Sequence, residues 1–227
     1  MEKQEKLITV TGRGGIHVVP DITRLELSLV SLHDSYEEAY EQGKNDADKL
    51  NEIMKAAKLS TKLPKTTRFD IDKKTITEYD KNDHYKGEKF LGFRLTHIIK
   101  IDLGIDNVVL NHVVQAIGQN LKQAEINIGY TVKDQRPCQL RMLERAVKDA
   151  REKAEIMAIA AGCRLGMCKS IDYSLNQITI YSQARSIHDP QEARCCNEAS
   201  LDITPDDLAV SDTVDTVWYL EENKSDD

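Results

Sequence analysis

Two stretches of the chain alternate apolar and polar side chains with a period of two residues. In the first, Leu25, Leu27 and Leu29 alternate with polar residues. In the second, the odd-numbered residues of 93–103 are apolar apart from His97. Successive side chains of a strand point to opposite faces, so the pattern predicts two strands with one buried face. His97 is accordingly interpreted as a core histidine with satisfied hydrogen bonds, and not as a ligand or a base.

Three segments repeat apolar residues at helical spacing and carry start or stop signals. These helices are expected at about residues 35–59, 106–118 and 137–162. Ser35 and Glu38 form a capping box at the start of the first helix, and either Asp106 or Asn107 can cap the second. Pro137 lies near the first position of the third helix, where its missing N–H has no cost.

The third helix has a narrow, alanine-rich seam. We predict that this seam consists of Leu140, Leu143, Val147, Ala150, Ala154, Met157 and Ala161. Its small side chains allow a neighbouring element to approach closely. Gly162 is expected to end the helix in a left-handed conformation.

The glycine-rich segment 12–15 separates two extended runs near the start of the chain. A phosphate-binding loop is excluded, because no Walker lysine or helix start follows it. The segment is predicted to be the turn of a hairpin, since glycine tolerates positive φ. Arg13 at its tip could contact an anion or a neighbouring subunit.

Three apolar runs and one β-branched, polar run (67–79) predict further strands. They cover residues 67–79, 126–132, 167–175 and 208–220, and residues 176–207 form a long polar excursion. Strand pairs interleaved with three helices indicate an α+β fold, with largely antiparallel sheet packed against the helices. We expect a single domain over residues 1–227 with a core at about 7–220. A composition shift near 64–68 could separate two lobes.

Charge and hydropathy exclude two classes of protein. The 227 residues include 31 basic and 38 acidic side chains, for a net charge of −7, which argues against nucleic-acid binding. No window approaches the roughly 20 apolar residues of a membrane-spanning helix. No apolar signal region follows the charged residues 1–6, so a cytoplasmic protein is expected, or a periplasmic one if an export signal has been removed.

Searches for catalytic and metal-binding motifs fail. The chain has no Gly-x-Ser-x-Gly elbow and no His-Glu-x-x-His pair. Segment 80–88 imitates a calcium loop, but Tyr85 stands where glycine is required. We therefore predict no catalytic, cofactor or metal-binding residues, and the sequence favours a protein that is not an enzyme. A ligand-binding module or hydrolase whose site is assembled from distant residues stays open.

The five cysteines do not form a disulfide framework. Cys138, Cys163 and Cys168 are expected to be small buried hydrophobes. A zinc site that adds Cys195, Cys196 and His188 to Cys163 and Cys168 is disfavoured by the spacing of the residues. The adjacent pair Cys195–Cys196 could instead undergo reversible oxidation.

Several separated stretches together resemble the SIMPL domain family, named for a signalling molecule associated with a Pelle-like kinase. The opening residues 8–14 followed by Val19-Pro20-Asp21 are similar to the family's first strand, glycine turn and Pro-Asp step. Residues 145–154, continuing to 160–166, are similar to its signature helix and glycine exit. The closing strand 210–220 also fits.

This resemblance implies an α+β fold and a tendency to form oligomers, which are large rings or channels in some bacterial relatives. It also implies a link to oxidative-stress defence and no catalytic residues. Bacterial relatives often carry an export signal, and the excursion with Cys195 and Cys196 departs from the compact family pattern. The leading hypothesis is a non-enzymatic homo-oligomeric assembly or interaction protein, which could also bind another protein. The alternatives are a thiol-based stress protein and a ligand-binding module or hydrolase.

Overall fold

The computed structural model describes residues 5–79, 84–121, 123–173, 180–187 and 204–222. These residues form an α+β fold with three helices and eight strands in two sheets, as the sequence predicts. The chain divides into two compact units. One contains residues 1–20, 132–181 and 206–227, and the other contains residues 21–131 and 182–205. Residues 64–68 fall in the second unit, where a strand begins.

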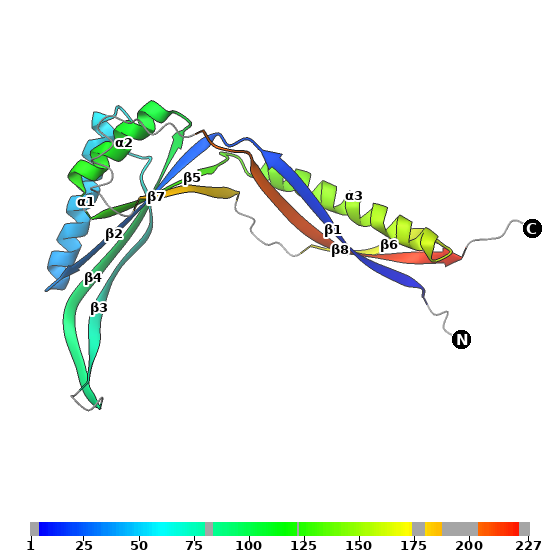
Figure 1. Cartoon of the computed structure of the whole chain (residues 1–227), viewed down its shortest axis with the longest axis horizontal. Coiled ribbons are helices and arrows are strands. Elements are labelled where there is room, and N and C mark those ends of the chain that lie inside the picture. Colours follow the sequence, from blue (N-terminus) through cyan, green and yellow to red (C-terminus); the bar gives the residue numbers. More distant parts are fainter. Residues whose placement is uncertain (1–4, 80–83, 122, 174–179, 188–203, 223–227) are drawn as a thin grey trace, which may run out of the picture. The chain divides into compact units, whose positions relative to one another are not determined.

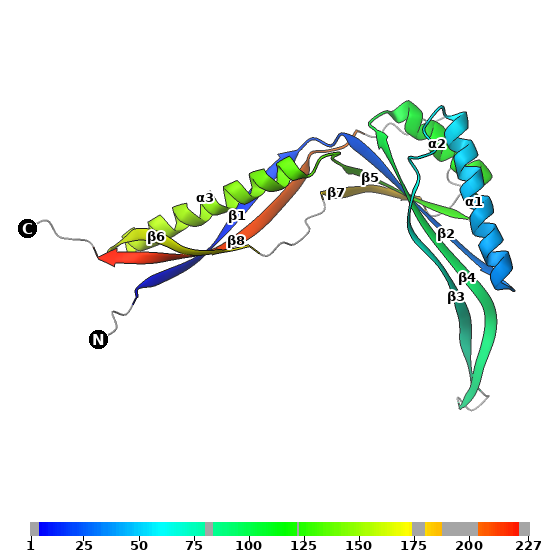
Figure 2. The same ribbon diagram turned by 180° about the vertical axis from the view of Figure 1, so that it is seen from behind.

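The first unit is a three-stranded antiparallel sheet with one long helix. Its strands are β1 (Leu7–Val18), β6 (Cys163–Asp172) and β8 (Leu208–Glu222), in the order β1-β8-β6. Helix α3 (Arg136–Ala160) lies along this sheet in both views (Figures 1 and 2). Pro137 is in its first turn and Gly162, with φ of 73°, follows its end, as predicted.

The predicted turn at residues 12–15 is wrong, because β1 continues through the glycines without interruption. A Cβ atom on Gly12 would lie 2.0 Å from the main-chain oxygen of Ala146, and one on Gly14 would lie 1.8 Å from that of Met142. The glycines therefore bring a strand into backbone contact with a helix. This is close approach, a different use of glycine from positive φ.

The helix seam is also different from the predicted one. The buried residues of α3 are Cys138, Met142, Ala146, Ala150, Ala154 and Ala158. Ala150 and Ala154 belong to this seam as predicted, but Leu140 and Met157 are at least half exposed. The predicted seam contained mostly large apolar side chains, whereas Gly12 of β1 packs against the small residues Ala146 and Ala150. Four residues of a helix rise about 6 Å, and two residues of a strand rise about 6.7 Å. A seam that repeats every four residues of α3 therefore stays in step with every second residue of β1.

The second unit is a five-stranded sheet covered by two helices. Its strands, in sheet order, are β3 (Lys65–Tyr79), β4 (Tyr85–Gly104), β2 (Ile22–His33), β5 (Ala124–Thr131) and β7 (Tyr181–Ile187). Helices α1 (Tyr36–Ala56) and α2 (Asn107–Asn120) pack on one face (Figure 1). Both predicted caps are confirmed, since the side chains of Ser35 and Asp106 accept backbone N–H groups of the first turns.

The core of the second unit lies between the sheet and its two helices. The predicted alternation is confirmed, because the side chains of Leu25, Leu27 and Leu29 on β2 are buried together with alternate residues of β4. They pack against apolar residues of α1 and α2. The core thus fixes the positions of α1 and of the connection from α2 to β5, which matter for the pocket described below.

Strand β7 was missed within the predicted polar excursion. Its residues, Tyr-Ser-Gln-Ala-Arg-Ser-Ile, show no apolar alternation, so backbone pairing at the sheet edge forms the strand without a hydrophobic signal. His188, Cys195 and Cys196 lie outside the described residues, as do residues 80–83 of the calcium-like segment.

Candidate functional sites

The β3–β4 hairpin extends beyond the rest of its sheet. Pairing of β2 with β4 ends where His33 faces Phe93, whereas β3 and β4 remain paired from that point to Tyr79 and Tyr85. Residues 73–79 and 85–92 thus form a two-stranded ribbon that β2 does not support (Figure 1). A two-stranded ribbon alone is marginally stable in water.

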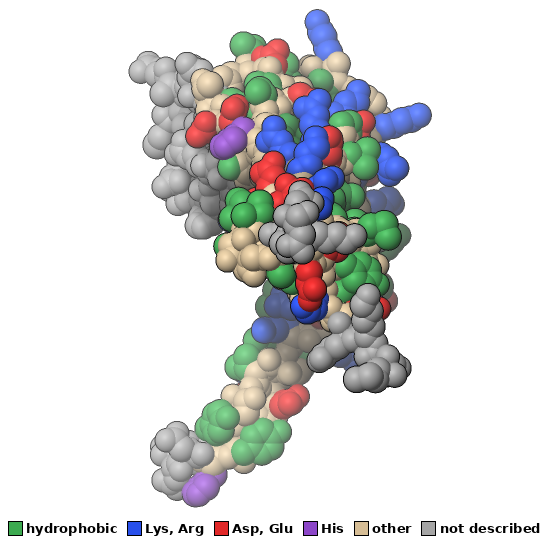
Figure 3. Space-filling model, turned by 90° about the vertical axis from the view of Figure 1, so that its right-hand side faces the viewer, with side chains coloured by type: hydrophobic (Ala, Val, Ile, Leu, Met, Phe, Trp, Pro, Cys, Tyr) green, Lys and Arg blue, Asp and Glu red, His purple; other side chains and the backbone are tan. Residues whose placement is uncertain are grey.

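This hairpin exposes large apolar side chains, which we call the hairpin surface. They are Phe69, Ile76, Tyr79, Tyr85 and Phe90. Tyr79 and Tyr85 are the most exposed, at 62% and 66%. Figure 3 shows hydrophobic side chains at several points along the hairpin, which forms the narrow lower part of that view. Tyr79 and Tyr85 face each other at the end of the ribbon, and neighbouring exposed aromatic residues are typical of an interaction surface.

Aromatic contacts hold the base of the ribbon to the body of the unit. The ring of Phe93 makes edge-to-face contacts with Tyr36 of α1 and with Phe90, with centroids 6.1 and 5.4 Å apart. Phe69 contacts the ring of His97 in the same manner at 5.0 Å. These contacts fix the direction in which the hairpin leaves the sheet.

In the first unit, three side chains of α3 reach the free edge of β1, and we call them the edge clamp. Arg145 donates to the carbonyl oxygen of Gly15 at 2.6 Å. Asp149 accepts the backbone N–H of Arg13 at 2.7 Å, and Lys153 donates to the carbonyl oxygen of Thr11 at 3.4 Å. The clamp occupies backbone groups with which another strand could pair.

Arg13 is placed within this edge. Its guanidinium donates to the hydroxyl of Ser211 from Nε and Nη2, at 3.1 and 3.0 Å. A shallow cavity of about 530 Å³ adjoins it, lined also by His17 and Lys153. The Lys153 ammonium, together with the Arg13 backbone N–H, lowers the pKa of the Asp149 carboxyl. Whether Arg13 contacts an anion or a neighbouring subunit stays a prediction.

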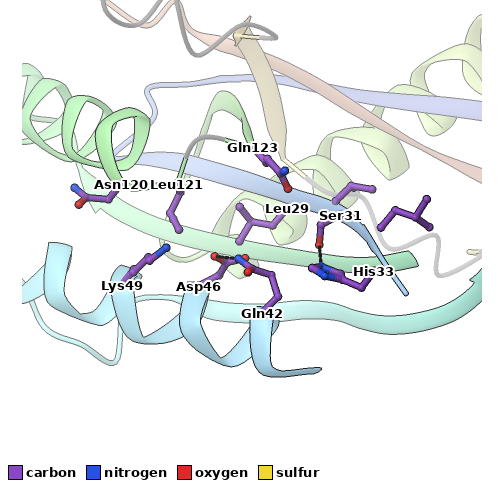
Figure 4. A pocket seen from close by; sticks show the side chains of 11 residues that line it. Leu29, Ser31, His33, Gln42, Asp46, Lys49, Asn120, Leu121 and Gln123 are labelled. Atoms are coloured by element: carbon purple, nitrogen blue, oxygen red, sulfur yellow. Dashed lines mark hydrogen bonds between the residues drawn. The ribbon is translucent and has the colours of Figure 1, made fainter. Parts of the chain in front are cut away.

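A pocket in the second unit was not found from the sequence, and we call it the α1 pocket. Strand β5 begins at Ala124, opposite Leu29 of β2. Residues 30–33 of β2 therefore have no β5 residue beside them, and a notch lies next to them before the start of β5. Helix α1 and the residues around the start of β5 border this notch and enclose a cavity of about 390 Å³ (Figure 4). Its polar lining residues are Ser31, His33, Gln42, Asp46, Lys49, Asn120 and Gln123.

Asp46 is the most unusual residue of the α1 pocket. Its side chain is on the buried face of α1, where the other members are Ala39, Gly43, Leu50, Ile53 and Met54. The residue is 8% exposed, and Gln42 donates a hydrogen bond to its Oδ1 at 2.8 Å. The sequence did contain a signal for this site, because Asp46 lies at the helical spacing of the apolar core positions of α1.

His97 is buried, as predicted, at 4% exposed. Thr66 Oγ1 lies within hydrogen-bond distance of its Nε2, at 2.9 Å. Its Nδ1 has no hydrogen-bond partner among the described residues. We expected both ring nitrogens to be hydrogen-bonded, and only one of them is. Burial lowers the pKa of this histidine, since the charged imidazolium loses solvation.

The cysteines with described positions differ in exposure. Cys138 is buried as predicted, but Cys163 is half-buried and Cys168 is exposed on β6. Within the described ranges, no three His, Cys, Asp or Glu side chains are grouped closely enough to hold a metal ion. No described helix has the length and apolar composition needed to cross a membrane.

The chain matches the sequence profile of a known protein family. The sequence profile of the SIMPL family, described as a protein of unknown function (DUF541), matches residues 8–218. No curated protein matches the chain. The matched region contains both units and every helix and strand start except that of β1. Because the match covers nearly the whole chain, the protein belongs to the SIMPL family.

Proposed function

We propose that this SIMPL-family protein is a non-enzymatic assembly protein that forms homo-oligomers through the hairpin surface. The observation that supports this function is the unsupported ribbon with Tyr79 and Tyr85 at its end. Burial of exposed aromatic side chains against a partner removes apolar area from water and stabilises the ribbon at the same time.

A second copy of the chain is the partner that suits this surface. The ribbon carries charges of both signs, with Lys73 and Lys74 on β3 and Glu88 and Lys89 on β4. A surface of mixed sign can pair with its own copy in a two-fold arrangement, where Glu88 of each copy meets a lysine of the other. The edge of β3 also has backbone groups available for pairing along the strand.

The link to oxidative-stress defence and the thiol-based alternative both extend this proposal. The family resemblance supports the first, and the adjacent cysteines Cys195 and Cys196 support the second. In the thiol alternative, oxidation of this pair changes the assembly state. The two ideas predict different responses of the oligomer to oxidant.

Light scattering after gel filtration tests the assembly, with and without reductant and after mild oxidation. We expect the wild type to have a mass of several chains, and a Tyr79→Ser, Tyr85→Ser variant to shift to the monomer. Val108→Ser is the matched control, because Val108 is 79% exposed in the same unit but lies on α2. A monomeric wild type across micromolar concentrations contradicts the proposal. An oligomer that depends on oxidation, and is lost in a Cys195→Ser, Cys196→Ser variant, favours the thiol alternative.

A further inference from the structure

The α1 pocket contains a buried acid, Asp46, whose charge acts on the buried imidazole of His97. Among the residues that the structure describes, Gln42 is the hydrogen-bond donor to Asp46, and no lysine or arginine forms an ion pair with it. An ionised carboxylate at a buried position lowers stability unless a cation or several donors compensate it. A leucine or alanine there would continue the apolar face of α1. Burial lowers the pKa of His97, so its neutral imidazole does not compensate the carboxylate, and the pocket can accept the cationic group of a ligand.

A basic group lies one helical turn away on the same wall. Lys49 follows Asp46 on α1, is exposed, and makes no ion pair or hydrogen bond with the described residues. In Figure 4 its amine is directed toward Leu121, across the mouth of the pocket. A pocket with one negative and one positive group suits a zwitterionic ligand, whose cationic group faces the acid and whose anionic group faces the amine.

The rest of the lining is suited to a small, otherwise uncharged molecule. Leu29 and Leu121 form an apolar wall, and the side-chain amides of Asn120 and Gln123 offer both donors and acceptors. The cavity volume of about 390 Å³ is within the range of small-molecule sites, roughly 300–1,000 Å³. The size of the pocket excludes a folded partner or a nucleic acid.

We propose that the α1 pocket binds a free amino acid with an uncharged side chain. Its ammonium group binds Asp46, its carboxylate binds Lys49, and its side chain packs on Leu29 and Leu121. This activity goes beyond assembly and does not depend on the hairpin surface, since no hairpin-surface residue lines the pocket.

Thermal unfolding of the full chain with each of the common amino acids at millimolar concentration is the first test. A ligand that binds the folded state raises Tm. We expect at least one amino acid with an uncharged side chain to raise it, and calorimetry to give its Kd. The corresponding decarboxylated amine and deaminated acid should each bind at least about tenfold more weakly, because each lacks one charged contact.

Two pairs of variants assign the contacts. Asp46→Asn should weaken binding at least about tenfold, whereas Asp48→Asn, which removes an exposed carboxylate of the same helix outside the pocket, should leave it unchanged. Lys49→Gln should reduce the ratio between the affinity for the amino acid and the affinity for its decarboxylated amine. Lys44→Gln should leave this ratio unchanged. The same results are expected in the Tyr79→Ser, Tyr85→Ser variant.

Three outcomes overturn the proposal. The first is that no amino acid raises Tm, and the second is that binding persists in Asp46→Asn. The third is that the amine binds as tightly as the amino acid, which would make the pocket a cation site. Lys49 is exposed, so its substitution does not threaten the fold and the test holds even if Asp46→Asn unfolds.

Discussion

A Cβ atom on Gly14 would lie 1.8 Å from the main-chain oxygen of Met142, so strand β1 and helix α3 are in direct backbone contact. This closeness has a consequence at the sheet edge. Because the helix axis is near the strand, side chains of α3 such as Asp149 reach the backbone of β1. The same glycines thus allow two contacts of α3 with β1. One is the packing of the alanine seam, and the other is the edge clamp on the adjacent face of the helix.

Replacement of Gly14 by alanine should destabilise the first unit. The added methyl group meets helix backbone, which cannot move as a flexible side chain would, and overpacking of this kind costs about 1–3 kcal/mol or more. The free energy of unfolding can be followed by the fluorescence of Trp218, the single tryptophan of the chain, which is buried in this unit.

Gly15→Ala is the control for this substitution. A Cβ atom on Gly15 would meet nothing closer than 3.9 Å, and its φ is not positive. Its effect should stay within about 0.5 kcal/mol of the wild type. Equal stabilities of the two variants would contradict the close packing of β1 on α3.

Removal of the Asp149 carboxylate should open the edge of β1. In Asp149→Ala the backbone N–H of Arg13 loses its acceptor, and Lys153 loses its ion pair at 2.7 Å. We expect faster hydrogen exchange of the Arg13 amide by NMR and a loss of about 1 kcal/mol in stability. Glu144→Ala is the control, because Glu144 pairs with Lys148 on the exposed side of the helix. An unchanged exchange rate at Arg13 would show that the clamp does not protect the edge.

The sequence predicts those parts of the fold that depend on local patterns. The alternation around Leu27 and the caps at Ser35 and Asp106 are short-range signals, and each predicts its element correctly. The glycines of β1 have two physical uses, positive φ and close approach. Only the helix that packs on them, more than a hundred residues later in the chain, decides between the two.

The candidate sites were less predictable, because they depend on where strands stop. The α1 pocket exists because β5 begins at Ala124 opposite Leu29, and the ribbon exists because β2 ends at His33. Neither end has a sequence signal strong enough to fix the sheet register. Asp46 has a signal in its helical spacing, but the residues around it become a pocket only in the folded sheet.

Burial of His97 should make the second unit less stable in mild acid. Its pKa is lowered in the folded state, so the unfolded chain binds the proton more tightly. The contribution of the neutral histidine is therefore complete above the unfolded pKa of about 6.5, and it is lost as the pH falls toward the lower folded value.

Hydrogen-exchange mass spectrometry of β4 peptides in urea measures this effect. The urea midpoint of the wild type should fall between about pH 7.5 and 5. His97→Gln keeps a polar group near Thr66 but does not titrate, so its midpoint should fall less. The substitution of exposed His112 in α2 by Gln controls for loss of any histidine in the same unit. Parallel pH curves for the wild type and His97→Gln would contradict the prediction.

The ion pair between Arg24 and Asp102 should stabilise the second unit only above strongly acidic pH. Arg24 donates from Nε and Nη2 to the two carboxylate oxygens, at 2.6 and 2.9 Å, across the β2–β4 pair. These bonds lower the pKa of Asp102. A lowered acid pKa gives stability that is complete above the unfolded value of about 3.9 and is lost as the pH falls through the lower folded value.

Asp102→Asn should therefore lower stability at pH 7 but not near pH 2. The pair is partly exposed to solvent, which screens it, so the loss should be about 1 kcal/mol or less, and smaller still in high salt. Urea midpoints of β2 and β4 peptides, from hydrogen exchange, measure it. Asp48→Asn, which removes an exposed carboxylate of the same unit, should have no effect at either pH. A loss that persists undiminished at pH 2 would contradict the prediction, because the protonated carboxyl and the amide then differ in neither charge nor size.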